Sequence, residues 1–341
     1  MSRSDRLLSR WRLIVASAVI LTLVLLLGGA ITARALIHRY EGSVARAELL
    51  DSSARSGASP GVRPSLRGPL NYLLIGSDKR AGDPEAGQRS DTIIIAQADR
   101  DLSHVFLVSI PRDLMVDIPH YRPAGFGGAT DKINAAFEYG GGGEHGVQLL
   151  SATLTRLTGL KFDGAAIIEF SGFRRVIDLL GGVQMCVDHK VRSIHTDRLY
   201  KVGCRRMNGA DALDYSRQRY GLPDGDYDRQ RHQQQLLKAI FQRAGDAGLA
   251  SNPFHVDELL RAVGQSLTVD TGGASLTDLV IALRRLGPGD LTGIRVPSYP
   301  GMVDDISYVF LEDGAEDLFT AARAVELSRW AAAHPQWVNN L

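Results

Sequence analysis

Four arginines close together in the sequence have the types and spacing of an anion-binding site. Arg217 and Arg219 lie two residues apart, and Arg229 and Arg231 follow a Gly/Pro/Asp-rich loop, where a helix should begin. On a helix with about 100° per residue, Arg229 and Gln233 continue the apolar stripe, whereas Arg231 lies nearly opposite and should be solvated. An unpaired guanidinium that faces the core is very costly. We therefore expect an anion to bind here.

The overall charge of the chain argues against a polybasic surface for nucleic acid. Lys and Arg total 39 and Asp and Glu total 38, so the net charge is +1 and no global field would attract nucleic acid. The arginine segment is itself nearly balanced by Asp224, Asp226 and Asp228. The charge pattern favours selective anion binding in a pocket, and no nucleic-acid partner is expected.

Three predicted strands bring a second set of charged residues together. The strands cover residues 72–76, 92–96 and 105–110, which are β-branched or aliphatic and are bounded by turn residues. The second connection is too short for a crossover helix and the first lacks helical periodicity, so both pairs should be antiparallel. One edge of the sheet should then collect Asp78, Arg80, Arg89, Asp91, Arg112 and Asp113.

The carboxylates at this edge allow two interpretations. Asp78 and Asp91 could simply form salt bridges with Arg80 and Arg89, as at many polar sheet edges. Alternatively, Mg²⁺ takes one or two protein carboxylates and completes its shell with water and phosphate oxygens. Arginines would bind the remaining phosphate oxygens, with ~1.5–3 kcal/mol for each charge-assisted contact. Two aspartates with inward-facing arginines fit a metal–diphosphate site better than a metal-only or an anion-only site.

The first residues of the chain predict a membrane anchor. Residues 1–12 form a basic tail, and the next 21 residues, 13–33, carry no charge. At ~1.5 Å per residue they can span a hydrocarbon layer of about 30 Å. We expect a transmembrane signal-anchor over residues 13–35, with the basic tail in the cytoplasm and the remaining chain on the other side of the cell membrane. A cleaved signal peptide is the alternative.

Residues 36–69 are rich in Ser, Gly, Pro and Ala and should form an extracytoplasmic linker.

Residues 70–330 are predicted to form one domain, followed by a C-terminal tail at 331–341. Strand and helix patterns alternate through the domain, which argues for an α/β fold with a mixed central sheet. Cys186 and Cys204 are the only cysteines, and outside the cytoplasm they favour one disulfide, with two free buried thiols as the alternative. The one G-x-S-x-G match, GASPG at residues 57–61, lies in the predicted linker and not between a predicted strand and helix, so the usual serine-hydrolase interpretation is not favoured.

Five motifs in order give the chain a resemblance to a known family. They are NYLLIGSDKR, RSDTIIIA, VSIPRDL, DKINAAFEYGG and YSRQRY…DRQRHQQQ. These motifs resemble the LytR–CpsA–Psr family of cell-wall phosphotransferases, from about Asn71 to Arg243 and more weakly to about residue 326. The resemblance implies an extracytoplasmic, membrane-anchored enzyme with a three-layer α/β/α domain. Such enzymes transfer a glycopolymer from a polyprenyl-diphosphate carrier to peptidoglycan, and they form a phosphodiester at the muramic acid primary hydroxyl.

Carried over by position, the resemblance also implies a set of site residues. Mg²⁺, with Mn²⁺ as an alternative, would be held at Asp78 and Asp91. The diphosphate would be bound by Arg89, Arg112, Lys132, Asn134, Arg217, Arg219, Arg229 and Gln233. The catalytic residues would be Arg112, Arg217, Arg219, Arg229 and Asp113, and the proton acceptor stays open between Asp113 and Asp91. An apolar tunnel would take the prenyl chain, with the helices after Val147 and Leu236 as its expected lining.

The sequence departs from the family pattern at two positions, and two other functions are compatible with the same residues. Asp228 stands where a small residue is expected, and the loop at Gly140–Gly143 looks enlarged.

A hydrolase of the lipid diphosphate would use the same site, with water in place of the sugar hydroxyl. A membrane-tethered glycan-binding regulator, or transcriptional attenuator, would bind its ligand without Mg²⁺ and without Asp78. Direct DNA binding is disfavoured, because about a dozen residues before the predicted span leave no room for a helix-turn-helix.

Overall fold

The structure of the chain is a computed structural model that describes residues 44–57, 66–77, 90–247, 264–274 and 276–341. The predicted basic tail and signal-anchor therefore lie outside the described residues, and so do Asp78, Arg80 and Arg89. Within the parts of the chain that are described, no helix has both the length and the apolar character needed to cross a membrane.

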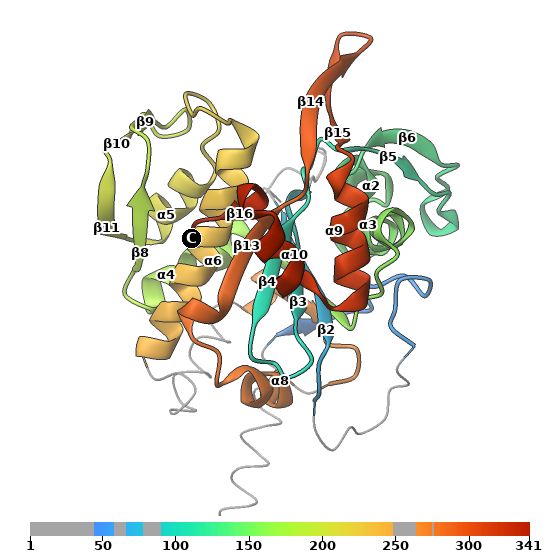
Figure 1. Ribbon diagram of the computed structural model, residues 1–341, viewed down its shortest axis with the longest axis horizontal. Coiled ribbons are helices and arrows are strands. Elements are labelled where there is room, and N and C mark those ends of the chain that lie inside the picture. The colour runs from blue at the N-terminus through green and yellow to red at the C-terminus, as the bar shows by residue number, and fades with distance from the viewer. Residues whose placement is uncertain (1–43, 58–65, 78–89, 248–263, 275) are drawn as a thin grey trace, which may run out of the picture. The chain divides into compact units, whose positions relative to one another are not determined.

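A mixed sheet of eight strands forms the centre of the described unit (Figure 1). Its middle is an antiparallel meander, in which Ser77 is opposite Ser90, and Ile94 is opposite Ser109. A parallel strand flanks the meander on each side. The predicted antiparallel pairing of the first three strands is therefore confirmed. In spatial order the strands are β1 (Ala45–Arg46), β12 (Leu267–Asp270), β7 (Gly164–Glu169), β2 (Leu70–Ser77), β3 (Ser90–Ala98), β4 (Val105–Ser109), β13 (Leu291–Arg295) and β16 (Val338–Asn339).

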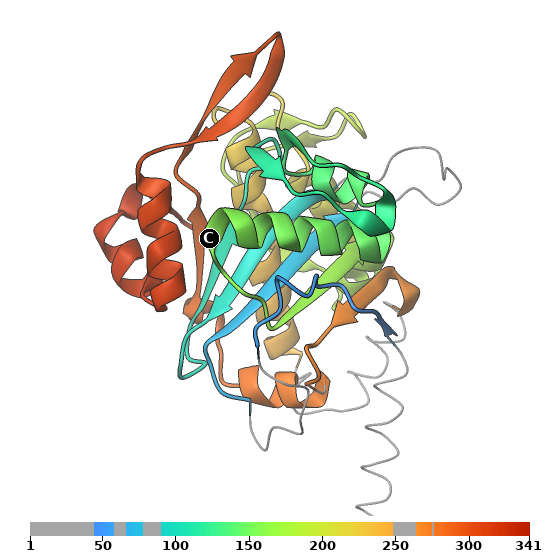
Figure 2. The same ribbon diagram turned by 90° about the vertical axis from the view of Figure 1, so that its right-hand side faces the viewer.

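Helices cover both faces of this sheet, because successive side chains of a strand point to opposite faces. Leu73 and Ile75 belong to one core cluster, whereas Leu74 packs in another with Leu237. The helices of the first face are α2 (Ala135–Tyr139), α3 (Gly143–Thr158), α9 (Gly314–Ala324) and α10 (Leu327–Ala333). Those of the second face are α4 (Phe170–Leu179), α5 (Gly209–Ser216) and α6 (Asp226–Asp246). Figure 2 shows α3 in front of the sheet and α6 behind it. The predicted α/β fold with a central mixed sheet is confirmed.

A second, smaller core packs against α6 on the side away from the central sheet. Its side chains include Val183, Met185, Tyr215 and Leu236, so α6 is enclosed between two cores. Its strands are β8 (Val183–Val187), β9 (Val191–Arg192), β10 (Leu199–Tyr200) and β11 (Gly203–Met207). The two cysteines lie opposite each other on β8 and β11 and form the predicted disulfide, Cys186–Cys204.

Both predicted boundaries of the domain need correction. Part of the predicted linker at residues 36–69 belongs to the domain, since Leu49, Leu50 and Ala54 are buried in the main core and β1 pairs with β12. The predicted tail at 331–341 contains β16, which pairs with β13. The surrounding Ser, Ala and Asn residues conceal the few apolar side chains that anchor these segments, and composition alone therefore misplaces the boundaries.

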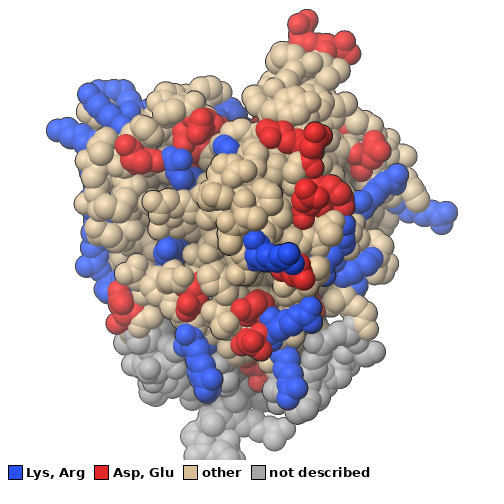
Figure 3. Space-filling model, viewed as in Figure 1, with Lys and Arg blue, Asp and Glu red and all other residues tan. Residues whose placement is uncertain are grey.

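Two hairpins lie at the same end of the described unit. One consists of β5 (Met115–Ile118) and β6 (Ala129–Lys132), and the other of β14 (Ser298–Val303) and β15 (Ile306–Leu311). The second hairpin projects well beyond the helices and the sheet (Figures 1 and 2). Basic and acidic residues are interspersed over much of the face in Figure 3, as a net charge of +1 leads one to expect, but the tip of this hairpin is acidic.

Candidate functional site

Asp91 and Arg112 meet at the sheet edge where β3 begins and β4 ends. The antiparallel pairing of the two strands brings these ends together, and Arg112 Nη1 donates to Asp91 Oδ1 at 2.5 Å. Arg112 Nε also lies 3.6 Å from Asp113 Oδ2. The predicted convergence of charged residues at this edge is therefore confirmed for Asp91, Arg112 and Asp113.

Arg229 is buried, with 4% of the residue exposed. The sequence requires an anion beside it, and a carboxylate of the chain supplies one, because Arg229 Nη2 lies 2.9 Å from Asp226 Oδ1. Arg229 Nη1 also lies 4.0 Å from Asp91 Oδ1. The same Asp226 oxygen is 3.8 Å from Arg112 Nε. Asp226 is thus shared between two arginines that come from distant parts of the sequence.

Lys132 extends this arrangement on the other side of Arg112. Its Nζ lies 3.1 Å from Asp113 Oδ1. The backbone N–H of the buried Asn134 donates to the Arg112 carbonyl at 3.1 Å, which holds the segment after β4 in place. A continuous series of contacts therefore joins Arg229, Asp226, Arg112, Asp113 and Lys132. We call these five residues together with Asp91 the charge cluster.

Two nitrogen atoms of the charge cluster are buried without an acceptor. The Nε atoms of Arg112 and Arg229 make no hydrogen bond with the described residues. Burial lowers the pKa of Arg229, against the opposite effect of Asp226. Burial acts on Arg112 in the same direction, but the carboxylates of Asp91, Asp226 and Asp113 outweigh it and raise the pKa of Arg112. A buried guanidinium with an unused N–H is stabilised by an added anion, which accepts that hydrogen bond.

The sequence around residue 225 explains why Arg229 lies at the start of α6. Gly225 precedes the helix with a φ of 54°, a conformation that favours glycine. Asp226 and Asp228 occupy the first turn, where the helix dipole stabilises carboxylates. As predicted, Arg229 is buried and Gln233 lies on the apolar face, beside Leu236 and Leu237 in the lining of a cavity.

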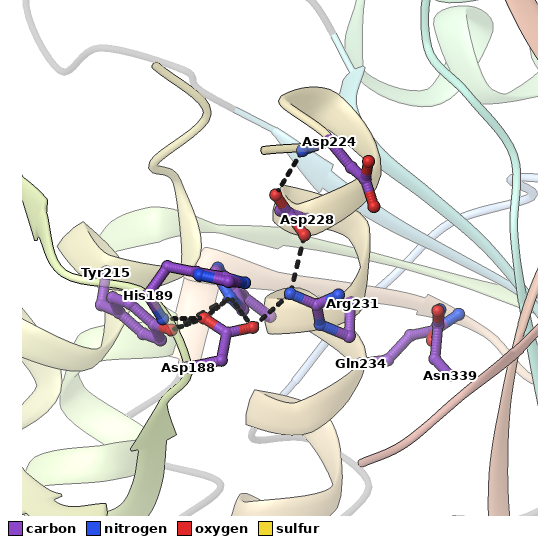
Figure 4. A network of polar contacts seen from close by, with 9 residues as sticks. Asp188, His189, Tyr215, Asp224, Asp228, Arg231, Gln234 and Asn339 are labelled. Carbon is purple, nitrogen blue, oxygen red and sulfur yellow. Dashed lines mark hydrogen bonds and ion pairs between the residues drawn. The ribbon is translucent and has the colours of Figure 1, made fainter. Parts of the chain in front are cut away.

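Arg231 does not point into solvent, contrary to the prediction. Its side chain is 25% exposed and forms ion pairs with Asp188 and Asp228, the second at 2.7 Å. Figure 4 shows Arg231 between these two carboxylates. The prediction assumed that the side of α6 opposite the sheet faces water, whereas the smaller core packs against that side.

Gln234 fixes α6 on the central sheet. Its Nε2 donates to the carbonyl oxygens of Leu107 at 2.7 Å and Ile294 at 3.0 Å, and to Ser109 Oγ at 2.8 Å. Its Oε1 accepts from Asn339 Nδ2 at 2.7 Å, and the two side chains lie side by side in Figure 4. The helix that carries Arg229 is therefore held over the junction of β4 and β13.

We expect Gln234→Leu to lower the free energy of unfolding by ~1–2 kcal/mol, because it leaves buried carbonyl groups without their donor. Urea denaturation of the full chain measures this change. Gln242→Leu is the matched control, since Gln242 is an exposed residue of the same helix and should change stability little. Equal stability of the two variants would show that Gln234 does not hold the helix.

An apolar cavity of about 210 Å³ lies between the sheet and helices α4, α5 and α6. Arg217 and Gln233 are among its lining residues, and Gln233 is one helical turn from Arg229, so the cavity adjoins the charge cluster. The prediction that the helix after Leu236 lines an apolar tunnel agrees with this cavity, because that segment belongs to α6. The helix after Val147 is α3, which packs on the other face of the sheet and does not line this cavity.

Arg217 and Arg219 differ in their surroundings. The guanidinium carbon of Arg217 lies 4.6 Å from the centre of the Phe170 ring, beside the cavity. Arg219 stacks on Tyr220 and donates from Nη2 to its hydroxyl at 2.8 Å. Among the described residues, neither arginine forms an ion pair with a carboxylate of the charge cluster. The positive charges of Arg217 and Arg219 are therefore less compensated by nearby carboxylates than those of Arg112 and Arg229.

The structure adds two residues to those that the sequence indicated. The sequence indicates Asp226 only as a balancing charge, although its position three residues before Arg229 is a spacing that favours an ion pair on a helix. His195 lies in the exposed connection between β9 and β10. Partial burial of its ring lowers the pKa of His195, and the positive charge of Arg217 lowers it as well. No local pattern in the sequence could have identified it.

The described residues of the charge cluster fit a magnesium site in which phosphate oxygens of a ligand would fill the remaining coordination positions. Asp91 Oδ1 accepts from Arg112, and Asp91 Oδ2 makes no hydrogen bond with the described residues. In the same residues, no three His, Cys, Asp or Glu side chains are grouped so that they could hold a metal alone. Mg²⁺ at phosphate sites commonly takes only one or two carboxylates. The second predicted ligand, Asp78, lies outside the described residues.

The chain belongs to the LytR_cpsA_psr family, whose family model matches residues 36–323. The match includes the charge cluster, the cavity and most of the central sheet. The family that the five sequence motifs suggested is thereby confirmed.

Two of the relatives are named for the cell wall, whereas another, the "regulatory protein MsrR" of Staphylococcus aureus, is named for regulation and is 33% identical over 51% of this chain and 48% of MsrR. The "probable cell wall biosynthesis protein LcpB" of Corynebacterium glutamicum is 32% identical over 286 residues, which are 79% of this chain and 64% of LcpB. The "polyisoprenyl-teichoic acid–peptidoglycan teichoic acid transferase TagU" of Enterococcus faecalis is 29% identical over 59% of this chain and 61% of TagU. The chain thus spans less than two thirds of the length of either relative. A solved structure of TagT bound to LI-WTA has a TM-score of 0.61 at 22% identity, over 83% of this chain and 98% of that one, and shows the same fold.

Proposed function

We propose that the chain is a membrane-anchored phosphotransferase that acts outside the cytoplasm. In this proposal it moves a glycopolymer from a polyprenyl-diphosphate carrier to the muramic acid primary hydroxyl of peptidoglycan and forms a phosphodiester there. The observation that carries the proposal is an apolar cavity adjoining buried arginines with unused N–H groups. A ligand with a hydrocarbon tail and a diphosphate satisfies both parts of this site.

The names of related proteins support the classes of donor and acceptor. The TagU relative is named for transfer from polyisoprenyl-teichoic acid to peptidoglycan, and the LcpB relative for cell-wall biosynthesis. The TagT structure of the same fold is described as bound to LI-WTA. The predicted anchor at residues 13–35 would keep the chain at the membrane, where a polyprenyl carrier must reside.

Each part of the donor has a matching part of the site. The prenyl chain would enter the cavity, and Arg217 and Gln233 would meet the phosphate attached to it. Arg112 and Arg229 would offer their unused N–H groups to the phosphate oxygens. Mg²⁺ or Mn²⁺ bound at Asp91, with Asp78 as the second proposed ligand, would neutralise negative charge on the diphosphate.

The reaction is an in-line displacement at the phosphorus that carries the glycopolymer. The oxygen of the acceptor hydroxyl forms a bond to this phosphorus, and the bond to the oxygen of prenyl phosphate breaks. Arg112 and Arg229 stabilise the charge that develops on the phosphate oxygens. The hydroxyl proton passes to Asp91 or Asp113, both of which lie in the charge cluster. Positioning and charge carry this reaction, and no serine or cysteine nucleophile is required.

The test uses the full chain in detergent with a polyprenyl-diphosphate-linked saccharide, Mg²⁺ and peptidoglycan from which attached polymers have been removed. We expect the saccharide to become covalently attached to peptidoglycan through a phosphodiester, and chelation of divalent cations to suppress the reaction. The same mixture without peptidoglycan is the control. Release of free saccharide phosphate at equal rates in both mixtures, with no attachment, would replace the transferase by a hydrolase. Binding of donor without any reaction would instead favour the regulator.

A further inference from the structure

The projecting hairpin β14–β15 is attached directly to the charge cluster. The backbone N–H of Val309 donates to the carbonyl of Asp113 at 2.9 Å, beside a bridge between Val309 and Leu114. The Tyr227 hydroxyl, from the first turn of α6, donates to the Ser298 carbonyl at 2.9 Å. The base of the hairpin is therefore fixed to the two segments that carry Asp113 and Arg229.

One face of this hairpin is aromatic. Tyr299 is opposite Phe310, and Gly301 is opposite Tyr308, so these four residues share a face. The rings of Tyr299 and Phe310 are stacked with centroids 5.7 Å apart, and Tyr308 follows 6.5 Å from Phe310. A Cβ at Gly301 would lie 2.8 Å from the Phe310 ring, so glycine leaves room for this ring. We call Tyr299, Tyr308 and Phe310 the aromatic face; Tyr299 is 50% exposed.

The aromatic face adjoins the end of the charge cluster that is distant from the cavity. The Nζ of Lys132 lies 5.5 Å from the centre of the Tyr308 ring, while its ion pair joins it to Asp113. The contacts of the cluster thus begin at Arg229, one turn from the cavity residue Gln233, and end beneath Tyr308.

We propose that the aromatic face binds the glycan strand of the acceptor, an inference that rests on the proposed function. In an in-line displacement the nucleophile approaches phosphorus from the side opposite the leaving group. The leaving prenyl phosphate points into the cavity, so the acceptor hydroxyl must arrive from the side of Lys132 and Tyr308. A sugar chain that presents its hydroxyl there lies against the hairpin.

The chemistry of the face suits pyranose rings. Each such ring has a flat side of C–H groups, which packs on an aromatic ring, and a rim of hydroxyls, which Tyr hydroxyls can bind. A contiguous exposed apolar surface of this kind marks an interaction site. The turn residues Asp304 and Asp305 give the hairpin an acidic tip (Figure 3), which disfavours contact with anionic lipid headgroups and with an anionic donor polymer.

The test compares Tyr299→Ala with Met302→Ala in the full chain. Met302 is 63% exposed on the opposite face of the same hairpin and is therefore a matched control. Transfer rates are measured against the concentration of polymer-free peptidoglycan and, separately, of the lipid-linked saccharide. We expect Tyr299→Ala to raise KM for peptidoglycan about tenfold, as loss of an aromatic contact does. The donor KM should stay unchanged, Met302→Ala should match the wild type, and Tyr299→Trp should restore the acceptor KM.

A binding measurement separates this inference from the proposed function. Soluble β-linked N-acetylglucosamine oligosaccharides are titrated into the wild type and the two alanine variants, and tyrosine or tryptophan fluorescence is recorded. Weaker binding by Tyr299→Ala alone supports the aromatic face even if no transfer occurs, in which case only the proposed function fails. A wild type that transfers normally together with an unchanged acceptor KM in Tyr299→Ala overturns the inference. So does an increased donor KM, which would place the donor on this face.

Discussion

Replacement of Arg229 by methionine should lower the rate of transfer by about 10²–10³-fold, as removal of one oxyanion donor does in other enzymes. Arg229 is buried and forms ion pairs with the carboxylates of Asp226 and Asp91. Its Nε has no hydrogen-bond acceptor among the described residues. Methionine keeps an unbranched apolar chain of similar length but offers no donor to a phosphate oxygen. Single-turnover kinetics with the lipid-linked saccharide measure the effect on the chemical step.

A loss of activity could also come from a damaged fold, because the substitution leaves Asp226 with one arginine fewer in a buried position. The double variant Arg229→Met/Asp226→Asn removes the uncompensated charge. It should recover most of the stability that Arg229→Met loses, but none of the transfer rate. Arg329→Ala is a control for charge alone, since the side chain of Arg329 is 87% exposed. Near-normal transfer by the double variant would remove Arg229 from the chemistry.

The position of Arg229 could be predicted because two local rules agree on it. Helical periodicity places the residue on the apolar stripe, and the cost of burying charge requires a partner for it. The sequence could not show that the partner present in the chain is Asp226. The same rules fail for Arg231, because a second core packs against the side of α6 that is opposite the central sheet. Which face of a helix meets a second core is decided by residues far away in the sequence.

The convergence of Asp91, Arg112 and Asp113 could be predicted because it depends only on short connections between neighbouring strands. Contacts across longer separations were not accessible in this way. Lys132 approaches Asp113 through the pairing of β5 with β6, and the sequence alone gave no register for that pair. The role of Lys132 was therefore implied only by the family resemblance.

The aromatic face was missed for a different reason. The β-branched and aromatic residues of Ile306–Leu311 indicate a strand, and the structure has one with these bounds, which carries Tyr308 and Phe310. Its partner strand was not predicted, because Pro300 and Gly301 interrupt the strand pattern, as both residues usually mark bends or edges. Without the partner strand, nothing in the sequence places Tyr299 beside Phe310.

A network on the outer side of α6 should contribute strongly to stability rather than to the chemistry. Asp188 forms ion pairs with Arg231 and accepts a hydrogen bond from the Tyr215 hydroxyl at 3.1 Å, and His232 Nε2 lies 3.1 Å from the same carboxylate. Figure 4 shows how Asp188 meets Arg231 and Tyr215. Asp188 directly follows β8, the strand with Cys186, so this carboxylate connects the disulfide-linked sheet to α6.

We expect Asp188→Ala to lower the free energy of unfolding by ~2–3 kcal/mol, less than for a fully buried ion pair because the side chain is partly exposed. Asp197→Asn, in the same sheet region, removes an exposed ion pair with Arg192, keeps a side chain that tolerates the left-handed backbone (φ 58°) and should cost less than ~1 kcal/mol. Urea denaturation of the full chain at neutral pH compares the two variants with the wild type. A similar small loss in both would mean that the network does not stabilise α6.

The pH dependence of this difference provides the sharper measurement. Burial alone raises the pKa of Asp188, but its hydrogen bond with His232 and the charge of Arg231 outweigh burial and lower the pKa below the ordinary value of 3.8. A carboxylate with a lowered pKa in the folded state stabilises the protein above its unfolded-state pKa and loses this contribution as the pH falls towards the folded value. The stability difference between wild type and Asp188→Ala should therefore be constant from neutral pH to about pH 5 and shrink progressively below about pH 4. A difference that stays constant under acidic conditions would show that lost packing, and not the charge of Asp188, explains the effect.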